Sequence, residues 1–161
     1  MGGQSIQAPP EKGVIQAPPG TGVIQFSVFT PNRLGQLHDL IALMGSQAVH
    51  ILGLTILDTI ESAIIRVVVD DPDRARELLR RHGFAHAEST LVVTEVNSTE
   101  DLNKLMAALL EAELNFNYLY SLIPHPQGKS ILAMSVEDNE LAAQALKRHN
   151  FPVFNQADIS R

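Results

Sequence analysis

Two stretches of the chain share one pattern. Residues 63–84 read AIIRVVVDDPDRARELLRRHGF, and residues 130–151 read SILAMSVEDNELAAQALKRHNF. Each begins with an apolar run typical of a strand, passes through acidic residues that favour a helix start, and then spaces apolar residues along one helix face. Each ends in His-Gly-Phe or His-Asn-Phe, and Gly and Asn best tolerate the left-handed backbone that follows a helix. The two stretches therefore predict the same strand–helix–strand unit twice.

The repeat continues on the N-terminal side of both stretches with a different spacing. Leu37 and Leu102 lie 65 positions apart, whereas Val69 and Val136 lie 67 apart. The change falls in the turn of a predicted hairpin, which is two residues longer in the second copy. Each copy reads strand–helix–strand–strand–helix–strand, and this order places two helices on one face of an antiparallel sheet. The sequence therefore predicts an α+β fold of two ferredoxin-like βαββαβ modules that lie side by side.

The domain organisation follows from the same pattern. We expect a flexible Pro/Gly-rich arm over residues 1–22, because its paired prolines favour extended backbone. A first module then covers residues 23–89 and a second covers 90–161. Near the module ends the pattern predicts strands over residues 84–88, 90–96 and 151–159.

Composition excludes several functional classes. The formal net charge is −6 and no Lys/Arg cluster interrupts it, which argues against nucleic acid as a partner. Because cysteine is absent, a disulfide framework, a thiolate metal site and a cysteine nucleophile are excluded. The chain has neither an apolar run of membrane-spanning length nor the pattern of a signal peptide. We therefore expect a cytoplasmic protein with no membrane partner.

The first strand–helix turn carries the sequence Pro31-Asn32-Arg33-Leu34-Gly35-Gln36-Leu37. This turn resembles that of the ACT domain, the amino-acid-sensing module of many metabolic enzymes. The strand after the helix, with His50-Ile51 in the first copy and Asn115 in the second, resembles a further signature of that family. The resemblance covers Val23 to Arg161 and looks like a free-standing tandem ACT protein.

The resemblance implies a non-catalytic, allosteric sensor that binds an amino acid at an interface between modules and regulates a partner or pathway. Backbone N–H groups at a helix start favour a carboxylate, and side-chain amides can accept from an ammonium group. The residues that it assigns to ligand binding are Asn32, Arg33, Leu34, Gly35, Gln36, Leu37, His50, Ile51, Asn115 and Asn117. The resemblance also implies a homo-oligomer, most simply a dimer, and a protein partner.

Three departures from the family pattern support an alternative function. Leu34 replaces the usual proline, His50 replaces the usual asparagine, and Glu100 stands opposite Gly35 in the second copy, where it would repel a carboxylate. The alternative is a structural or adaptor protein whose ligand sites have decayed. Two roles also remain open for Asn115 and Asn117. Asparagines on a strand indicate either a polar functional role or an edge strand that faces water.

Catalytic and metal sites are not expected. The six histidines lack the spacing of a metal motif, and no Gly-x-Ser-x-Gly or other catalytic pattern occurs. His82 and His149 occupy equivalent positions in the last turns of two predicted helices, where imidazole suits the helix C-terminus. We therefore expect a protein that is not an enzyme and that needs no cofactor or metal.

Overall fold

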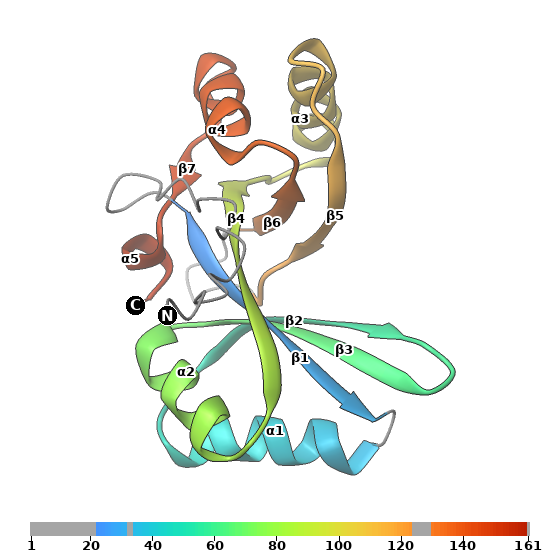
Figure 1. The fold of residues 1–161 in the computed structure, drawn as a ribbon. Coiled ribbons are helices and arrows are strands. Elements are labelled where there is room, and N and C mark those ends of the chain that lie inside the picture. Colours follow the sequence, from blue (N-terminus) through green and yellow to red (C-terminus); the bar gives the residue numbers. More distant parts are fainter. Residues whose placement is uncertain (1–21, 32–33, 124–129, 161) are drawn as a thin grey trace, which may run out of the picture.

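The structure is a computed structural model that describes residues 22–31, 34–123 and 130–160. The predicted arm, residues 1–22, lies outside these ranges apart from Gly22. Figure 1 shows two sheet-and-helix halves whose helix pairs lie at opposite ends of the molecule. The elements are, in order, β1 (Val23–Pro31), α1 (Leu34–Ser46), β2 (Ile51–Asp58), β3 (Ser62–Val69), α2 (Pro72–Arg81), β4 (Ala85–Glu95), α3 (Thr99–Glu111), β5 (Phe116–Ser121), β6 (Ile131–Val136), α4 (Asn139–Arg148), β7 (Val153–Phe154) and α5 (Gln156–Ile159). The predicted α+β fold of two βαββαβ units is confirmed.

The seven strands form one sheet in the order β2-β3-β1-β4-β6-β5, with β7 paired to β4. All the pairings are antiparallel. The first half has the order β2-β3-β1-β4 and the second has the order β5-β6-β4-β7. Both are the strand order of a ferredoxin-like module, and β4 belongs to both.

The predicted strands over 84–88 and 90–96 are in fact one strand. Residues 85–91 of β4 pair with β1, and residues 92–95 pair with β6. The sequence of β4 contains no glycine or proline to interrupt it, so the chain passes from one half to the other without a turn. The proposed boundary between residues 89 and 90 therefore falls within a continuous strand.

The end of the chain also differs from its prediction. The strand expected over residues 151–159 is limited to β7, and the short helix α5 follows it. Asn155 and Asp158 form a reciprocal capping box, in which each side chain accepts from the other residue's backbone N–H. This local hydrogen bonding begins a helix where continuous β pairing was expected.

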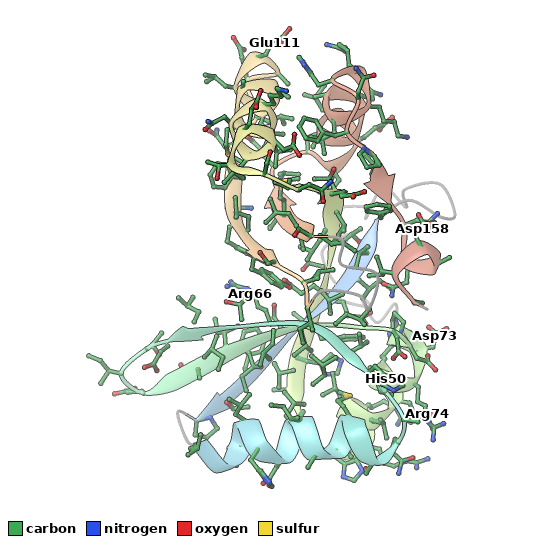
Figure 2. The ribbon with its side chains drawn as sticks, turned by 180° about the vertical axis from the view of Figure 1, so that it is seen from behind. His50, Arg66, Asp73, Arg74, Glu111 and Asp158 are labelled. Atoms are coloured by element: carbon green, nitrogen blue, oxygen red, sulfur yellow. The ribbon has the colours of Figure 1, made fainter. Side chains whose placement is uncertain are left out.

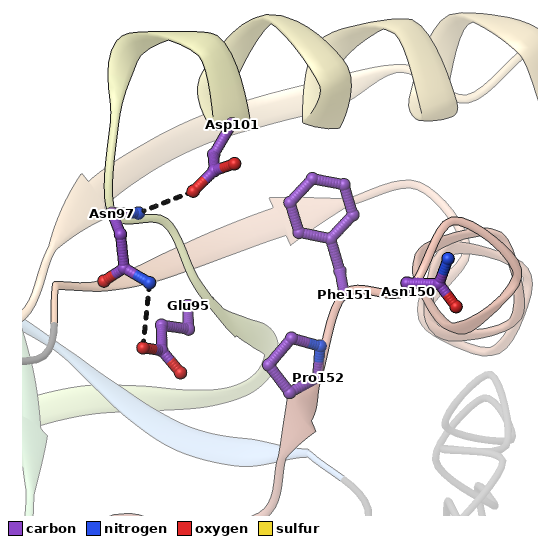
Figure 3. Close-up of a pocket in the computed structure, with 6 residues that line it drawn as sticks. All are labelled: Glu95, Asn97, Asp101, Asn150, Phe151 and Pro152. Carbon is purple, nitrogen blue, oxygen red and sulfur yellow. Dashed lines mark hydrogen bonds between the residues drawn. The ribbon is translucent and has the colours of Figure 1, made fainter.

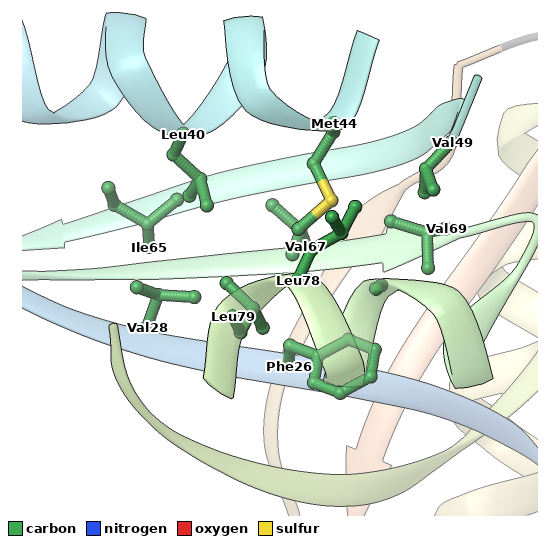
Figure 4. Close-up of a cluster of buried hydrophobic side chains, with 11 residues drawn as sticks. Phe26, Val28, Leu40, Met44, Val49, Ile65, Val67, Val69, Leu78 and Leu79 are labelled. Atoms are coloured by element: carbon green, nitrogen blue, oxygen red, sulfur yellow. The ribbon is translucent and has the colours of Figure 1, made fainter. Parts of the chain in front are cut away.

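Each half has its own apolar core beneath its helices. Figure 4 shows the first, where Leu40 and Met44 of α1 pack with side chains of β1, β3 and α2. An equivalent cluster in the second half includes Leu105 and Leu109 of α3 and Leu146 of α4.

A third apolar cluster joins the helix-free faces of the two halves. It includes Val23 and Val68 from the first half and Leu122 and Ala133 from the second. The face of the first sheet that its helices leave open is therefore partly covered by the second half of the same chain.

Helix ends repeat as the sequence predicts. Asp71 and Asp138 cap α2 and α4 by accepting from the backbone N–H three residues later. After the helices, Gly83 and Asn150 both adopt left-handed backbone, with φ of 71° and 64°.

Candidate functional site

The start of α1 presents an open, acid-free turn. Asn32 and Arg33 lie outside the described residues, and α1 begins at Leu34, whose side chain is 85% exposed. A Cβ atom added to Gly35 would meet nothing within 4 Å, so space remains beside the backbone. The first turn of α1 has no acidic residue, whereas those of α2, α3 and α4 do. The positive end of the α1 dipole therefore has no acidic side chain of its own first turn beside it.

The other two predicted residues of this turn are less accessible. Gln36 is half-buried, and Leu37 packs against the first core cluster. Leu37 therefore contributes to folding, and the accessible part of the turn is Leu34 and Gly35.

The corresponding turn of the second half is closed by its own acidic residues. Ser98 caps α3 by accepting from the backbone N–H of Asp101 at 3.1 Å, and the Asp101 carboxylate accepts from the backbone N–H of Asn97 at 3.1 Å. Asn97 Nδ2 also donates to Glu95 at 3.0 Å. As Figure 3 shows, Glu95, Asn97 and Asp101 line one side of a pocket of about 180 Å³, and Asn150, Phe151 and Pro152 complete it. Two carboxylates on this pocket disfavour an anionic ligand.

His50 and Ile51 lie far from the α1 turn within the first half. They follow α1 and open β2, whereas Leu34 and Gly35 begin α1. A helix of 13 residues is about 20 Å long, so one amino acid cannot contact both ends of α1. Ile51 is half-buried against the first core cluster.

Asp70 fixes His50 in place. One oxygen of the Asp70 carboxylate accepts from the His50 backbone N–H at 2.8 Å, and the other lies 2.7 Å from His50 Nδ1. The Asp70 backbone N–H in turn donates to the His50 carbonyl at 3.1 Å. These bonds lock the base of the β2–β3 hairpin.

Asn115 and Asn117 occupy a similar place on the second hairpin. Asn115 Nδ2 lies 3.4 Å from Glu137 Oε2, and the Asn115 carbonyl accepts from the Glu137 backbone N–H at 3.1 Å. Asn117 Nδ2 donates to Ser135 at 3.3 Å. A register shift between Phe116 and Tyr118 interrupts the regular alternation expected along this strand. Both asparagines are exposed, and each makes a hydrogen bond within its own hairpin.

A buried polar group that the sequence did not reveal lies where the two halves meet. Gln25 is 0% exposed, and its Nε2 donates to Ser89 at 3.1 Å and to the Tyr118 hydroxyl at 2.7 Å. The Tyr120 hydroxyl donates to Gln25 Oε1 at 2.6 Å. The Arg66 guanidinium carbon lies 3.9 Å from the centre of the Tyr118 ring. We call these five residues the junction cluster.

Burial in the junction cluster changes the chemistry of Tyr120. Loss of solvent raises the pKa of the Tyr120 hydroxyl, and the neighbouring Tyr118 raises it further. The hydroxyl therefore stays protonated and continues to donate to Gln25. The signal available in the sequence was Gln25 between two apolar residues of β1 and Arg66 as the only charged residue of β3.

The described residues contain no group of three His, Asp or Glu side chains arranged to hold a metal ion. No helix in that part of the chain is long and apolar enough to cross a membrane. His82 and His149 are the C-caps of α2 and α4, which agrees with a shared structural role.

Solved structures support the fold. Protein BT0572 from Bacteroides thetaiotaomicron is similar with a TM-score of 0.80 and 20% identity, over 88% of this chain and 98% of that one. The regulatory subunit of aspartate kinase from Thermus thermophilus, in a ligand-free form, has a TM-score of 0.56 and 11% identity, over 83% and 95% of the two chains. The corresponding subunit from Thermus flavus has a TM-score of 0.54 and 14% identity, over 81% and 98%. At these identities the likeness concerns the fold alone.

Comparison of sequences identifies the family. No curated protein matches the chain significantly. A family model described as the ACT domain pair, however, matches residues 21–161. This range contains both βαββαβ halves, and it confirms the resemblance seen at the first strand–helix turn. The chain therefore belongs to the ACT domain pair family.

Proposed function

We propose that this protein is a non-catalytic regulatory sensor that binds an amino acid at the start of α1. The observation that carries the proposal is the contrast between the two equivalent turns. The α1 turn is exposed, free of acidic residues and open beside Gly35, whereas the α3 turn is filled by Ser98 and Asp101. The α1 turn can receive a carboxylate on its helix N–H groups, and the α3 turn repels one.

The rest of the ligand needs a second surface. His50 and Ile51 lie beyond the far end of α1, so they cannot complete this site within their own half. We place the second surface on another copy of the chain, where the starts of β2 or β5 would supply His50, Ile51, Asn115 or Asn117. Such a site exists only in a homo-oligomer, so ligand binding and assembly are coupled.

Regulation would follow from that coupling. A ligand that binds the assembled state better than the separated one shifts the population toward assembly, and a protein partner can read the difference. Two of the similar structures are regulatory subunits of aspartate kinase, which agrees with a regulatory role for the fold.

The alternative function is a structural or adaptor protein with no ligand. His50 is held by two hydrogen bonds to Asp70, and Asn115 lies against Glu137, so both contribute to hairpin structure without any ligand. Ligand-induced stabilisation separates the two functions.

A thermal-shift panel of the twenty amino acids at millimolar concentration tests the sensor. A ligand at a hundredfold excess over its Kd stabilises the fold by about 2.7 kcal/mol, which raises Tm by several degrees. We expect a shift from one or a few amino acids in the wild type and no shift in Gly35→Glu, because the new carboxylate repels that of the ligand.

Gly45→Glu is the matched control. Gly45 lies in the same helix, and an added Cβ there also meets nothing within 4 Å, so the variant adds the same charge far from the turn. It should keep the ligand-induced shift. Absence of a shift with all twenty amino acids in the wild type, or an undiminished shift in Gly35→Glu, would overturn the proposal.

A further inference from the structure

Arg66 occupies a distinct place on the helix-free face of the first sheet. It lies on β3 and is paired in register with Ser27 of β1 and Thr55 of β2. The neighbouring row toward the second half contains Gln25 and Val68, which are both 0% exposed. Figure 2 shows Arg66 in the angle between the projecting β2–β3 hairpin and the second half. Arg66 therefore marks the edge of the covered part of this face.

The Arg66 guanidinium is fixed in position but has no counter-charge among the residues that the structure describes. The guanidinium carbon of Arg66 lies 3.9 Å from the centre of the Tyr118 ring, and Gln25 Nε2 donates a hydrogen bond to the Tyr118 hydroxyl. Arg66 Nε is buried and has no hydrogen-bond partner among the described residues. Across the same ranges Arg66 forms no ion pair, whereas Arg76 and Arg81 both pair with carboxylates.

Module docking alone does not account for this arginine. Gln25, Ser89, Tyr118 and Tyr120 satisfy one another by hydrogen bonds, so they are explained by the contact between the two halves. Arg66 as a whole is only half-buried, so an anion would bind its Nη donors, since Nε is out of reach of solvent. A carboxylate matches the planar guanidinium with two parallel hydrogen bonds.

The surroundings define the rest of the ligand. Beyond Arg66, away from the second half, the next row across the sheet contains Phe29, Ile64 and Leu57. Phe29 and Leu57 are each 47% exposed, so this row is an open apolar surface. It lies two residues along the strands from Arg66, a distance of about 7 Å. Neither row contains an acidic residue that would hold an ammonium group, since their β4 members are Ala85 and Ala87.

We propose that Arg66 and the row of Phe29, Ile64 and Leu57 form a second binding site, for a small carboxylate with an apolar body and no ammonium group. The carboxylate lies on Arg66, where the Ser27 and Thr55 hydroxyls flank it as further donors, and the apolar body lies along the outer row. This site is separate from the α1 turn and goes beyond the proposed amino-acid sensor.

Tyrosine residues of the chain serve as an intrinsic fluorescent probe for this site. It contains two tyrosines and no tryptophan, and both tyrosines belong to the junction cluster. Tyrosine fluorescence therefore reports on the junction cluster, to which Arg66 belongs. We would titrate the full chain with sodium hexanoate, and with hexylamine and hexanol as probes that carry the same apolar body.

We expect a saturable fluorescence change with hexanoate in the wild type. Arg66→Gln should bind hexanoate at least tenfold more weakly, whereas Arg80→Gln, which removes an exposed arginine from α2, should bind it as the wild type does. The absence of a saturable change with hexanoate would overturn the site. So would equal binding of hexylamine or hexanol, or unchanged hexanoate binding in Arg66→Gln.

Two further measurements separate this proposal from a folding defect in Arg66→Gln and from the proposed amino-acid site at the α1 turn. In the wild type alone, raising the salt concentration should weaken hexanoate binding, and salt-independent affinity would contradict a charge-based site. Gly35→Glu should keep the full hexanoate response, because its change lies at the start of α1. A hexanoate response that is lost in Gly35→Glu would show that the two sites are one and would overturn this inference, whatever the amino-acid panel shows.

Discussion

At the scale of single residues, the Arg76–Glu88 pair joins helix α2 to strand β4. Arg76 Nε and Nη2 donate to the two Glu88 oxygens at 2.8 and 2.6 Å, and Arg76 Nη1 donates to Asp73 at 2.8 Å. The hydrogen bonds from Arg76 lower the pKa of Glu88, and those to Glu88 and Asp73 raise the pKa of Arg76. The side chains of Arg76 and Glu88 are 40% and 35% exposed, so solvent screens much of their attraction.

Glu88→Gln should reveal this pair through its pH dependence. Because the folded pKa of Glu88 lies below its unfolded value, the pair stabilises the fold above about pH 4.3, and this contribution is lost as pH falls through the folded pKa. We expect Glu88→Gln to lose roughly 0.5–1 kcal/mol of unfolding free energy at pH 7 and less than that at pH 3. Urea unfolding at both pH values measures the difference.

Glu77→Gln is the control for that measurement. Glu77 pairs with Arg81 at 3.2 Å along α2, and both side chains are more than half exposed. Its loss should therefore be only a few tenths of a kcal/mol. A Glu88→Gln loss that is equal at pH 7 and pH 3 would contradict an ionic origin.

At the scale of elements, both halves end their last long helix in the same way. His82 and His149 are the C-caps, and Gly83 and Asn150 follow in left-handed backbone. A Cβ atom added to Gly83 would meet nothing within 4 Å, so only the backbone conformation limits which residue is allowed there. The second half already contains the non-glycine residue that this conformation tolerates best.

Substitution of Gly83 tests the equivalence of the two helix ends. Gly83→Asn should change the unfolding free energy by less than about 0.5 kcal/mol, whereas Gly83→Val should lose about 1–2 kcal/mol because a β-branched residue resists left-handed backbone. Thermal unfolding followed by circular dichroism measures both. Equal losses in the two variants would indicate steric crowding instead of backbone conformation.

At the scale of the whole molecule, the two halves are joined by β4 and by contact between β2 and the end of β5. The Ile123 backbone N–H donates to the Leu52 carbonyl at 2.6 Å. A Cβ atom added to Gly53 would lie 2.4 Å from Leu122 Cδ2, and Leu122 is only 4% exposed. Gly53 therefore provides the space into which the second half docks.

Gly53→Ala should weaken this docking. The new methyl group must displace a buried leucine, which we expect to cost about 1–3 kcal/mol of unfolding free energy. Gly45→Ala is the matched control, because the same change at an open helical position should be neutral or stabilise by up to about 1 kcal/mol. Chemical unfolding of both variants gives the comparison.

A double variant tests whether contact with Leu122 causes the loss of stability in Gly53→Ala. Leu122→Ala removes the atom that the new methyl group would meet, so Gly53→Ala should cost less in that background than in the wild type. Strictly additive losses would place the strain of Gly53→Ala somewhere other than the contact with Leu122.

Much of the architecture could be read from local pattern. The period of Leu40 and Met44, the caps at Asp71 and Asp138 and the left-handed Gly83 and Asn150 depend on neighbours a few residues away. The α1 turn was identified as a candidate site through its resemblance to the ACT domain. Continuous β4 and short β7 were missed, because strand ends depend on which partner strand the chain finds.

The junction cluster lay beyond any local pattern. Gln25 meets Tyr118 and Tyr120 from strands more than ninety residues away in the chain, and its burial depends on how the second half covers the first sheet. The distance between the α1 turn and His50, by contrast, follows from the length of a helix that the sequence already predicts.

The sequence by itself therefore determined two βαββαβ repeats and their helix caps, because these follow from short-range periodicity and backbone preference. Only the tertiary structure decided that one strand serves both halves, that Gln25 is buried where the halves meet, and that Arg66 forms no ion pair among the described residues. These features arise where residues distant in the chain exclude water together, and burial of that kind is a property of the packed molecule.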